Sequence, residues 1–424
     1  MISKFKQTEI GLIPEDWELR PIKSSFDFVG NNTFARNSMS NIGEVVNIHY
    51  GDVLIKYGAN VDVSSDSVMF LDPSIRTIAA HRLQNGDIVM ADTAEDETAG
   101  KCCEIIGAEN KQVEAGLHTF VLRPKNKYAP KFLGYAFNAD FYHNQLVPLM
   151  QGTKVTSISK SAVGATFLLC PPLAEQERIA TALSDMDKLI IDLESLIAKK
   201  QLIKQGTMQQ LLTGKKRLNG FSGKWIIKQL GNTCIIKARI GWQGLTTDEY
   251  LNSGNYYLIT GTDFNDGHID WKHCHYVSKE RYEQDKHIQI KNHDVLITKD
   301  GTIGKVAFLG IIPQEGTLNS GVFVVRAKDP NINQEYLGWV FLSKFFTDFI
   351  DKLTAGSTIQ HLYQKDIVSF EFPVPPSICE QMEISSVLNK FDEDITFLKA
   401  KLDKYVNIKQ GMMQELLTGK IRLV

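Results

Sequence analysis

The residues with the greatest potential for chemistry include a glycine-rich turn, Gly301-Thr302-Ile303-Gly304-Lys305. A phosphate-binding loop needs about four residues between its glycines and a Ser or Thr after the Lys. Here two residues separate Gly301 from Gly304, and Val306 follows the Lys. The spacing therefore indicates a hairpin turn and excludes a nucleotide-binding loop of that type.

A second candidate is the run His273-Cys274-His275, because His residues at i and i+2 of a strand share one face. Zinc sites usually add a second Cys or His pair at a fixed spacing, and none accompanies this run. We expect ordinary packing or polar contacts for these side chains, with a metal site as the alternative. The adjacent Cys102 and Cys103 point to opposite faces of any strand, and we expect them to be buried.

Other catalytic signatures are missing from the sequence. No Asn-Pro-Pro-Tyr motif of adenine methyltransferases is present, since the Pro pairs at 171–172 and 375–376 follow Cys170 and Val374. The acidic cluster between residues 92 and 97 lacks the lysine context of a nuclease, so we expect a solvated loop there. These observations predict a chain with no catalytic residues and no metal or cofactor of its own.

The elements that position these residues come in two copies. Residues 204–218 read KQGTMQQLLTGKKRL and residues 409–423 read KQGMMQELLTGKIRL, an offset of 205 residues with 12 of 15 positions identical. The pair Glu175-Gln176 recurs at the same offset as Glu380-Gln381, each shortly after a Pro pair. A match this long predicts an internal repeat, in which one architecture is built twice.

Between these landmarks the apolar residues of each copy are spaced alternately four and three apart, which is the heptad pattern of a coiled coil. The preceding Pro pairs and the following Gly214 and Gly419 predict helices over 174–212 and 379–417, each about 58 Å long. We expect the helices to pack antiparallel along these seams; an amphipathic helix covering a globular core is the alternative. The twelve seam residues are Ile179, Leu183, Met186, Ile190, Leu193, Ile197, Ile384, Leu388, Phe391, Ile395, Leu398 and Leu402.

Two segments, 18–170 and 219–374, precede the helices. Short apolar or alternating runs punctuated by Gly, Asn and Asp predict strands, and each segment closes with an aromatic helix and a small-residue turn. The predicted fold class is α/β (α+β): two strand-rich domains separated by two long antiparallel coiled-coil helices, with a pseudo-two-fold internal repeat. The predicted domain boundaries are 1–170, 171–217, 218–374 and 375–424.

Composition indicates an ordinary globular protein: 424 residues, 43% hydrophobic and 23% charged, with a net charge of -2. There is no apolar run long enough to span a membrane, no apolar signal core and no CxxC pair, so we expect a cytoplasmic protein with reduced thiols. Residues 18–170 hold 14 Lys and Arg against 16 Asp and Glu, and residues 219–374 hold 16 against 17. This balance excludes charge-driven nucleic-acid binding but leaves specific recognition open.

Three stretches of the sequence are distinctive: TEIGLIPEDWE at 8–18, PPLAEQERIA at 171–180, and the repeated LLTGK at 211–215 and 416–420. With these stretches in this order, the chain resembles, over essentially its whole length, the specificity subunits of type I restriction-modification systems. The resemblance implies that 1–170 and 218–374 are target-recognition domains, each reading one half of a split site in double-stranded DNA. It also implies a non-catalytic chain on which two methyltransferase subunits using S-adenosylmethionine dock, joined by two restriction subunits using ATP and Mg.

Side chains with forked donors and acceptors read bases, Arg at guanine and Asn or Gln at adenine. We expect such residues in loops where the two domains differ, and we expect the polar turns at 152–157 and 356–361 to hold phosphate; a solvated surface side chain is the alternative at each position. The candidates in the first domain are Asn31, Asn32, Arg36, Asn37, Arg76, Arg82, Thr153, Lys154 and Thr156. The candidates in the second domain are Arg239, Trp242, Gln243, Thr246, Thr247, Tyr250, Lys299, Ser357, Thr358, Gln360 and His361.

Two other functions fit the same pattern. A coiled-coil adaptor with two protein-binding heads and no DNA role would also keep its scaffold and vary its heads. The recognition half of a fused restriction-methyltransferase would do the same, although the sequence carries no methyltransferase or nuclease motif. If the chain recognises DNA, about 58 Å of helix corresponds to about 17 base pairs, and we expect deletion of one heptad to change the spacer without changing the half-sites.

Overall fold

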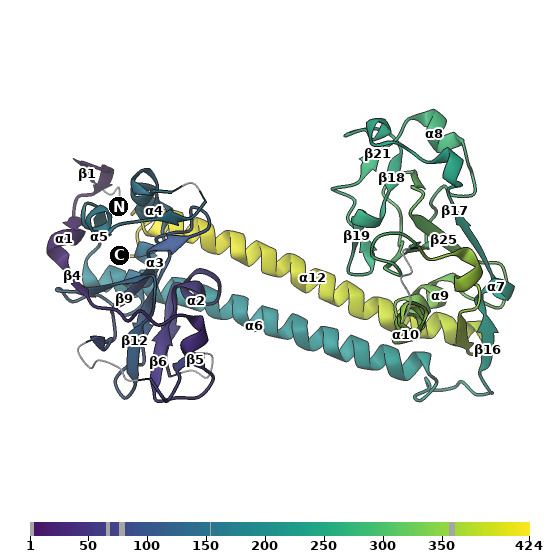
Figure 1. Cartoon of the computed structure of the whole chain (residues 1–424), viewed down its shortest axis with the longest axis horizontal. Helices are drawn as coiled ribbons and strands as arrows, with labels where there is room; N and C mark the ends of the chain where they lie inside the picture. The colour runs from purple at the N-terminus through teal and green to yellow at the C-terminus, as the bar shows by residue number, and fades with distance from the viewer. Residues whose placement is uncertain (1–3, 65–67, 76–80, 153, 356–360) are drawn as a thin grey trace. The chain divides into compact units, whose positions relative to one another are not determined.

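The computed structural model describes residues 4–64, 68–75, 81–152, 154–355 and 361–424. The chain divides into two compact units (Figure 1): unit 1 is Met1–Glu194 with Ala400–Val424, and unit 2 is Ser195–Lys399. This division differs from the four consecutive segments predicted from the sequence. Each unit joins one strand-rich domain to the first half of one long helix and the second half of the other.

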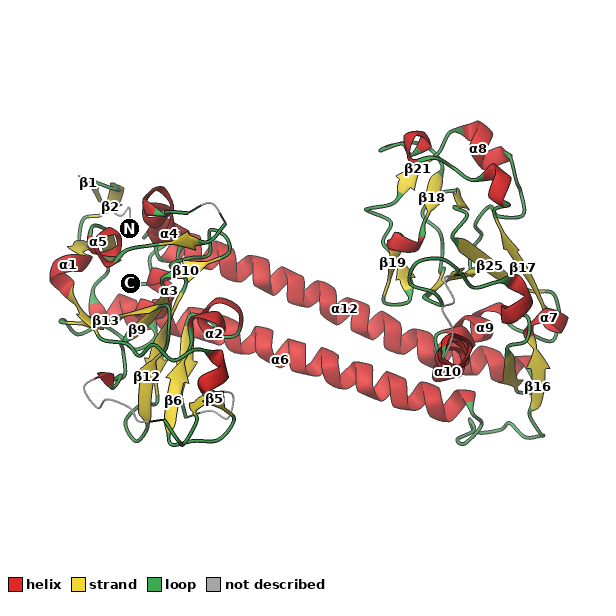
Figure 2. Ribbon diagram, in the orientation of Figure 1, coloured by secondary structure: helices red, strands yellow, loops and turns green. Residues whose placement is uncertain are grey.

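The two long helices predicted from the heptad pattern are α6, Leu173–Leu212, and α12, Ile378–Leu416 (Figure 2). Each is followed within a few residues by a glycine in the left-handed region, Gly214 with φ 67° and Gly419 with φ 73°. A side chain at either position would strain the backbone, so the glycine ends the helix at a defined residue.

The helices run antiparallel within each unit, as an ion pair that occurs twice shows. In unit 1, Lys409 late in α12 lies 2.5 Å from Asp187 in the first half of α6. In unit 2, Lys204 late in α6 pairs with Asp392 in the first half of α12. The two pairs are equivalent by the 205-residue offset, so the repeat extends from the sequence to the contacts between the helices.

None of the twelve seam residues is exposed. Ile179, Leu183, Leu193, Ile197, Ile384, Leu388 and Ile395 are buried, and Met186, Ile190, Phe391, Leu398 and Leu402 are half-buried. Ile179 and Leu183 join the apolar core of unit 1 together with Phe132, and Ile384 and Leu388 join the corresponding core of unit 2. The first residues of each seam therefore pack against a strand-rich domain, so the seam does not contact only the other long helix.

The Gln of each Glu-Gln pair fastens its helix to the adjacent domain. Gln176 Oε1 accepts a hydrogen bond of 3.0 Å from the backbone N–H of Ala129. Gln381 Oε1 accepts one of 2.8 Å from the backbone N–H of Asn333. Both glutamines are almost fully buried, at 3% and 0% exposure. The repeated pair is thus part of the connection between helix and domain.

Within its described residues, the domain of unit 1 contains two larger sheets and three two-stranded ones, β1-β2, β10-β14 and β15-β3. A five-stranded sheet has the order β4-β13-β9-β11-β7, and a four-stranded sheet has the order β12-β6-β8-β5. The bounds of the first are Phe26–Val29, Thr119–Pro124, Ile88–Ala91, Cys102–Ile106 and Asn60–Asp62, and those of the second are Gln112–Ala115, Val45–Ile48, Phe70–Leu71 and Met39–Ser40. The central strand β9 alternates between two cores: Ile88 and Met90 face the helices, and Val89 and Ala91 face the second sheet.

The domain of unit 2 repeats this layout with fewer strands. Its sheets have the orders β17-β25-β22-β23 and β21-β18-β24. The bounds are Cys234–Ala238, Val322–Ala327, Val295–Thr298 and Val306–Phe308 for the first, and His275–Tyr276, Tyr257–Ile259 and Gly316–Leu318 for the second. Strand β22 alternates as β9 does, with Val295 and Ile297 in one core and Leu296 in the other.

The aromatic helix predicted late in each domain is present, followed by a second helix, and the pair packs against the main sheet. They are α3, Phe132–Phe137, and α4, Asp140–Leu146, in unit 1, and α9, Gln334–Phe341, and α10, Lys344–Thr354, in unit 2. Cys102 and Cys103 are both fully buried, and the cysteines are free thiols. Among the helices of the described residues, none is long and apolar enough to cross a bilayer.

Candidate nucleic-acid interface

In each unit, the chain that follows the first strand of the main sheet carries a polar residue whose side chain is buried. In unit 1, Asn32 follows β4, is 8% exposed, and donates from Nδ2 to Glu114 Oε2 at 3.0 Å. In unit 2, Arg239 follows β17, is 1% exposed, and donates from Nε to the carbonyl of Leu318 at 2.9 Å. The structure thus places Asn32 and Arg239, two of the predicted base-reading residues, inside the domains, where their donors bind other protein groups.

Two further candidates make contacts within unit 1, and one in unit 2 is buried. Asn31 is half-buried and donates from Nδ2 to the carbonyl of Gly116 at 3.1 Å. Arg82 lies 3.2 Å from the buried carboxylate of Glu114, and its side chain is 26% exposed. Gln243 is 8% exposed, and its Oε1 is buried with no hydrogen-bond partner among the described residues. Asn31 and Arg82 therefore hold the loops that leave the sheets.

An exposed surface remains in unit 1 where strand ends meet, and we call it the first loop surface. Arg36 Nη1 lies 2.5 Å from Asp52 Oδ2, and Asp52 belongs to α2, Tyr50–Ile55, directly after β6. The ring of Tyr50 meets that of His118 edge-on with 5.4 Å between centroids. His118 Nδ1 lies 3.3 Å from Asp92 Oδ1. This chain of contacts joins the ends of β6, β9 and the start of β13.

The polar turn of unit 1 reaches the same surface. Strand β14, Thr156–Ser157, pairs antiparallel with β10, Thr93–Ala94, directly after Asp92. Thr156 is half-buried in this pairing, and Lys154 before it is exposed. Asn37, in the turn after β4, is exposed as well. The candidates Arg76 and Thr153 lie outside the described residues.

His49 lies beneath the first loop surface and is held in its neutral form. Its Nδ1 accepts a hydrogen bond of 3.1 Å from the backbone N–H of Gly51, and its ring centroid lies 4.6 Å from that of Tyr50. Burial lowers the pKa of His49, against the opposing effect of Asp52. A neutral acceptor nitrogen is what the cap of α2 requires.

The second loop surface, in unit 2, is built from Tyr250, His275, Asn319, Asp300 and His361. Tyr250 Oη accepts a hydrogen bond of 2.7 Å from Asn319 Nδ2, and its ring lies 5.3 Å from that of His275. His361 Nδ1 lies 2.5 Å from Asp300 Oδ1. Asn319 directly follows β24, and Asp300 comes two positions after the end of β22.

Thr246 and Thr247 are exposed at the start of a short 3-10 helix, Thr247–Glu249. The backbone N–H of Thr246 donates to Glu249 Oε2 at 2.9 Å, which closes a capping box. Arg281 donates from Nε to Glu249 Oε1 at 2.6 Å and lowers the pKa of Glu249 to about 2. The loop is thus ordered by local charge, and the exposed Thr247 remains a candidate contact.

The other candidates of unit 2 have different surroundings. Lys299 is half-buried, with Nζ 5.6 Å from the ring centroid of Phe323. Trp242 lies in a 3-10 turn, Gly241–Gln243. Ser357, Thr358 and Gln360 lie outside the described residues.

The two loop surfaces occupy equivalent places, as backbone hydrogen bonds show. The N–H of Asp92 donates to the carbonyl of His118 at 3.1 Å, and the N–H of Lys299 donates to that of Gly321 at 2.8 Å. The strand-end carbonyls of Asp92 and Lys299 each accept in turn from the polar segment, at 2.9 and 2.8 Å. These backbone hydrogen bonds occur in both units, whereas the side chains around them differ. The two loop surfaces therefore present different side chains on equivalent backbones.

Sequence reasoning missed the residues that join these surfaces: Asp52, Tyr50, His118 and Asp92 in unit 1, and Asn319, His275 and Asp300 in unit 2. His275 lies in β21, Asp52 lies in α2 shortly after β6, and the others lie within two positions of the end or start of a buried strand, which was the available signal. Which strand ends are neighbours is set by the parallel pairing of β6 with β12 and of β18 with β24. A period-two pattern does not reveal that pairing.

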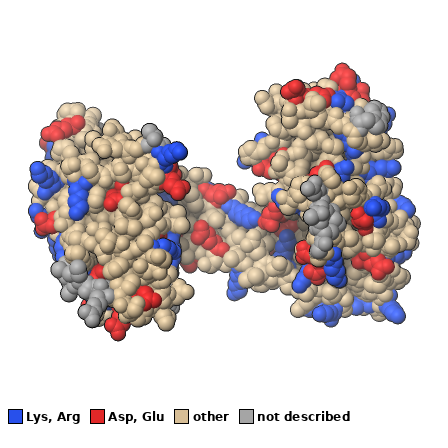
Figure 3. All heavy atoms as spheres, in the orientation of Figure 1, with Lys and Arg blue, Asp and Glu red and all other residues tan. Residues whose placement is uncertain are grey.

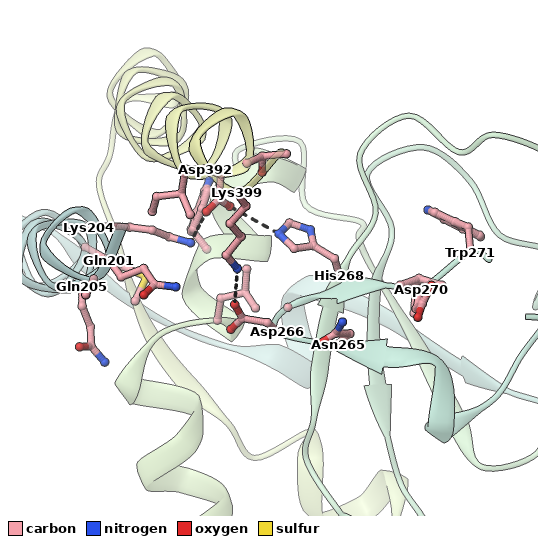
Figure 4. Close-up of a pocket in the computed structure, with 18 of the residues that line it drawn as sticks. Gln201, Lys204, Gln205, Asn265, Asp266, His268, Asp270, Trp271, Asp392 and Lys399 are labelled. Atoms are coloured by element: carbon pink, nitrogen blue, oxygen red, sulfur yellow. Dashed lines mark hydrogen bonds and ion pairs between the residues drawn. The ribbon is translucent and has the colours of Figure 1, made fainter. Parts of the chain in front are cut away.

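A cavity of about 1220 Å³ lies in unit 2 between the long helices and the hairpin at 264–269 (Figure 4). Lys204 pairs with Asp392 there, and Lys399 Nζ lies 3.4 Å from Asp266 Oδ2. Because these charges pair with one another, the cavity is not arranged for an anionic phosphate. None of the predicted DNA-reading residues lines it.

The surface charges are mixed in sign. On the face drawn in Figure 3, Lys and Arg are interspersed with Asp and Glu in each unit. Among the described residues, no group of three or more His, Cys, Asp or Glu is arranged to hold a metal ion. His273 instead places Nδ1 2.7 Å from Asp270 Oδ2, while Cys274 is buried.

Comparison with known proteins agrees with this two-surface arrangement. The model of the type I restriction modification DNA specificity domain matches residues 14–205 and again 222–406. The MjaX type I restriction enzyme specificity subunit of Methanocaldococcus jannaschii is 26% identical over 99% of this chain and 97% of its own length. The EcoBI specificity subunit of Escherichia coli is 25% identical over 48% of this chain and 46% of its own.

Solved structures show the same fold. The S subunit of a type I restriction-modification system from M. genitalium superposes with a TM-score of 0.59, at 17% identity, covering 98% of this chain and 99% of that one. Fold and paired surfaces therefore define a class of two-module recognition proteins. The chain belongs to the type I restriction modification DNA specificity family.

Proposed function

We propose that this chain is the non-catalytic DNA-recognition subunit of a type I restriction-modification enzyme, and that each unit reads one half of a split site. The observation that carries the proposal is the equivalence of the two loop surfaces, which share backbone links and differ in side chains. A protein that reads two unrelated half-sites needs that arrangement, because specificity comes from side chains at base edges and position comes from the framework.

The partners follow from this role. The relatives are named as subunits of type I restriction enzymes, which favours DNA over the protein-adaptor alternative. We infer that two methyltransferase subunits using S-adenosylmethionine dock on this chain, and that two restriction subunits using ATP and Mg join them in the cytoplasm. The chain itself supplies recognition and scaffolding and binds none of these cofactors.

The decisive test is a methylation map of DNA from cells expressing this chain with its neighbouring methyltransferase subunit. We expect two short half-sites around a fixed spacer, methylated on both strands. Cells expressing the methyltransferase subunit without this chain are the control and should lack the motif. Absence of chain-dependent methylation, with the methyltransferase subunit shown to be bound, would support the adaptor function.

A second experiment addresses the weak basic character of both domains. With 14 Lys and Arg against 16 acidic residues in 18–170, few phosphates can be neutralised by this chain alone. We expect the isolated chain to bind the target weakly, and the complex with methyltransferase subunits to bind it much more tightly. Equal affinity of the two would show that this chain supplies the phosphate contacts itself.

The spacer offers a third test. Deletion of seven residues from each long helix shortens each by about 10 Å. We expect the methylated motif to keep both half-sites while its spacer changes. An altered half-site with an unchanged spacer would show that the helices do not set the separation.

A further inference from the structure

One ion pair on the first loop surface differs from the other arginine pairs of the described chain. Arg36 Nη1 lies 2.5 Å from Asp52 Oδ2, with the Arg36 side chain 55% exposed and that of Asp52 3% exposed. The other described arginines that pair with a carboxylate have side chains between 11% and 29% exposed. Arg36 thus combines a fixed attachment with a guanidinium that faces mostly solvent.

Stability accounts for only part of this arrangement. The buried carboxylate of Asp52 needs a cation beside it, but that need alone does not require the guanidinium of Arg36 to face solvent. What a buried Asp52 does provide is orientation, because one nitrogen of Arg36 is held while the rest of the planar group stays accessible. Side chains that must meet a ligand in one geometry are usually held by a second residue in this way.

The chemistry of a guanidinium held at one nitrogen is that of guanine recognition. Arginine reads guanine through two parallel hydrogen bonds to O6 and N7 in the major groove, using two donors of its fork. Tyr50 and His118, on the same surface, supply aromatic rings beside the helix that carries Asp52. We propose that Arg36, positioned by Asp52, reads a guanine in the half-site recognised by unit 1. The inference rests on the function proposed above.

An arginine–carboxylate pair in a loop of unit 2 is arranged differently. Arg281 is 26% exposed, and it binds Glu249 Oε1 through Nε at 2.6 Å and Gln284 Oε1 through Nη1 at 2.9 Å. Two sides of its fork are therefore used inside the loop. Because the guanidinium of Arg36 is mostly exposed and that of Arg281 is bound within its loop, we assign the guanine contact to unit 1. The half-site read by unit 2 then serves as an internal control.

The experiment is a methylation map with variants of the full chain, coexpressed with the methyltransferase subunit. Arg36→Ala and Arg36→Lys should both reduce the preference for guanine at one position of one half-site by about 5- to 150-fold, since Lys lacks the fork. Asp52→Asn should reduce it at the same position by less. The double variant Arg36→Ala/Asp52→Asn should match Arg36→Ala, because Asp52 acts through Arg36.

Two controls separate recognition from folding. The other half-site should keep its sequence in every variant, which reports that the complex is assembled. Lys127→Ala removes an exposed charge beyond the far end of β13 from His118, and it should leave every position of the motif unchanged.

Three results would overturn the inference: Arg36 variants that keep full guanine selectivity, variants that relax a position other than guanine, or an Asp52→Asn effect at a different position. A wild-type chain that directs no split motif would instead remove the proposed function, and this inference with it. A wild-type split motif left intact by the Arg36 variants would overturn the guanine contact alone.

Discussion

Each unit has a buried glutamate near the start of a long helix, Glu175 in unit 1 and Glu380 in unit 2, and the two have partly different partners. In unit 2, Glu380 is fully buried and receives Arg217 through Nε at 2.9 Å and Nη2 at 2.5 Å. In unit 1, Glu175 receives Arg422 through Nε at 2.8 Å and Nη2 at 2.7 Å. Glu175 also accepts a hydrogen bond of 3.0 Å from Trp17 Nε1. The repeat thus keeps the Arg–Glu pair, and unit 1 adds a third member.

The tryptophans show how far the equivalence extends. Trp17 lies against Gly419 and Trp225 lies against Gly214, so each indole packs on the glycine that ends a long helix. Trp225 Nε1, however, is buried and has no hydrogen-bond partner among the described residues. In unit 1, Arg422 makes two further hydrogen bonds to the carboxylate of Asp16, at 2.9 and 2.7 Å.

Chain connectivity explains the difference. Arg217 and Trp225 are eight positions apart on a continuous chain, whereas Arg422 and Trp17 come from opposite ends of it. Bringing two distant ends together costs more conformational entropy than closing a short loop. The bonds from Asp16 and Trp17 offset that cost. Arg217 also makes two further hydrogen bonds, to the carbonyls of Gly223 at 2.6 Å and Ser222 at 3.0 Å. Both carbonyls, however, lie in the loop that already connects Arg217 to Trp225. In unit 1 the further bonds reach a segment distant in sequence, so they reinforce the contact where no short loop does.

The largest difference in stability between the two units is expected when their tryptophans are replaced. Trp17 is fully buried in the core of unit 1, so Trp17→Ala should reduce the free energy of local unfolding by about 3–5 kcal/mol. Trp225 is half-buried, and Trp225→Ala should reduce that of unit 2 by much less. Hydrogen exchange resolved by segment measures each unit separately, which a single melting curve does not. Equal losses in the two units would contradict the proposed reinforcement.

The second difference between the units is in the pH dependence of their stability, and it arises where Glu104 binds the start of α3. In unit 1, Glu104 Oε2 accepts from the N–H of Gly134 in α3, whereas in unit 2 Phe308 lies against the equivalent Gly338. Burial raises the pKa of Glu104 to about 7. Because its pKa is higher in the folded state, Glu104 stabilises unit 1 fully below about pH 4.5. This stabilisation, on the order of 3 kcal/mol, is lost as the pH rises through about 7.

Unit 1 should therefore lose more hydrogen-exchange protection than unit 2 between pH 4.5 and 7. The matched variant is Glu104→Gln, which keeps a hydrogen-bond acceptor and cannot ionise. We expect it to flatten the pH dependence of unit 1 and leave that of unit 2 as it was. An unchanged slope in unit 1 would show that Glu104 is not its source.

The arginines offer a third comparison. Arg422→Ala removes charge-assisted hydrogen bonds, about 2–3 kcal/mol of local stability, while Glu175 keeps its bond from Trp17. We expect the segment at 417–424 to become sensitive to limited proteolysis. Arg217→Ala should loosen unit 2 with less exposure of the backbone to protease, because a short loop still connects residue 217 to Trp225. Faster cleavage around 213–225 than around 417–424 would contradict the connectivity argument.

The smallest effect is expected at the glycines that end the helices. An alanine in the left-handed region costs about 1 kcal/mol at Gly214, where its Cβ would lie 3.3 Å from Trp225. At Gly419 the Cβ would overlap the ring of Pro14 in the N-terminal segment, so the loss should be larger. Hydrogen exchange resolved by segment, applied to the two single variants, measures the difference. A larger loss at Gly214 would show that the contacts around Gly419 adjust more easily.

The lowered pKa values of His49 and Glu249 belong to helix caps, and the raised pKa of Glu104 belongs to a residue within β11; the repeat predicts none of them. The sequence did predict both long helices to within one residue at each end. It did so because a heptad stripe, a Pro pair and a left-handed glycine are local signals. It did not predict that each compact unit would contain halves of both helices, since that depends on which distant segments pack together.

The candidate DNA contacts show the same division. Asn32, Arg239 and Arg36 are similar in sequence terms, since each is a forked polar side chain after a strand. The structure buries Asn32 and Arg239 and leaves Arg36 exposed beside Asp52. The sequence by itself determined the repeat, the helices and the family, because these rest on periodic and local patterns. Only the tertiary structure decided which polar side chains face solvent, because a buried donor is satisfied by whatever carbonyl or carboxylate the fold places beside it.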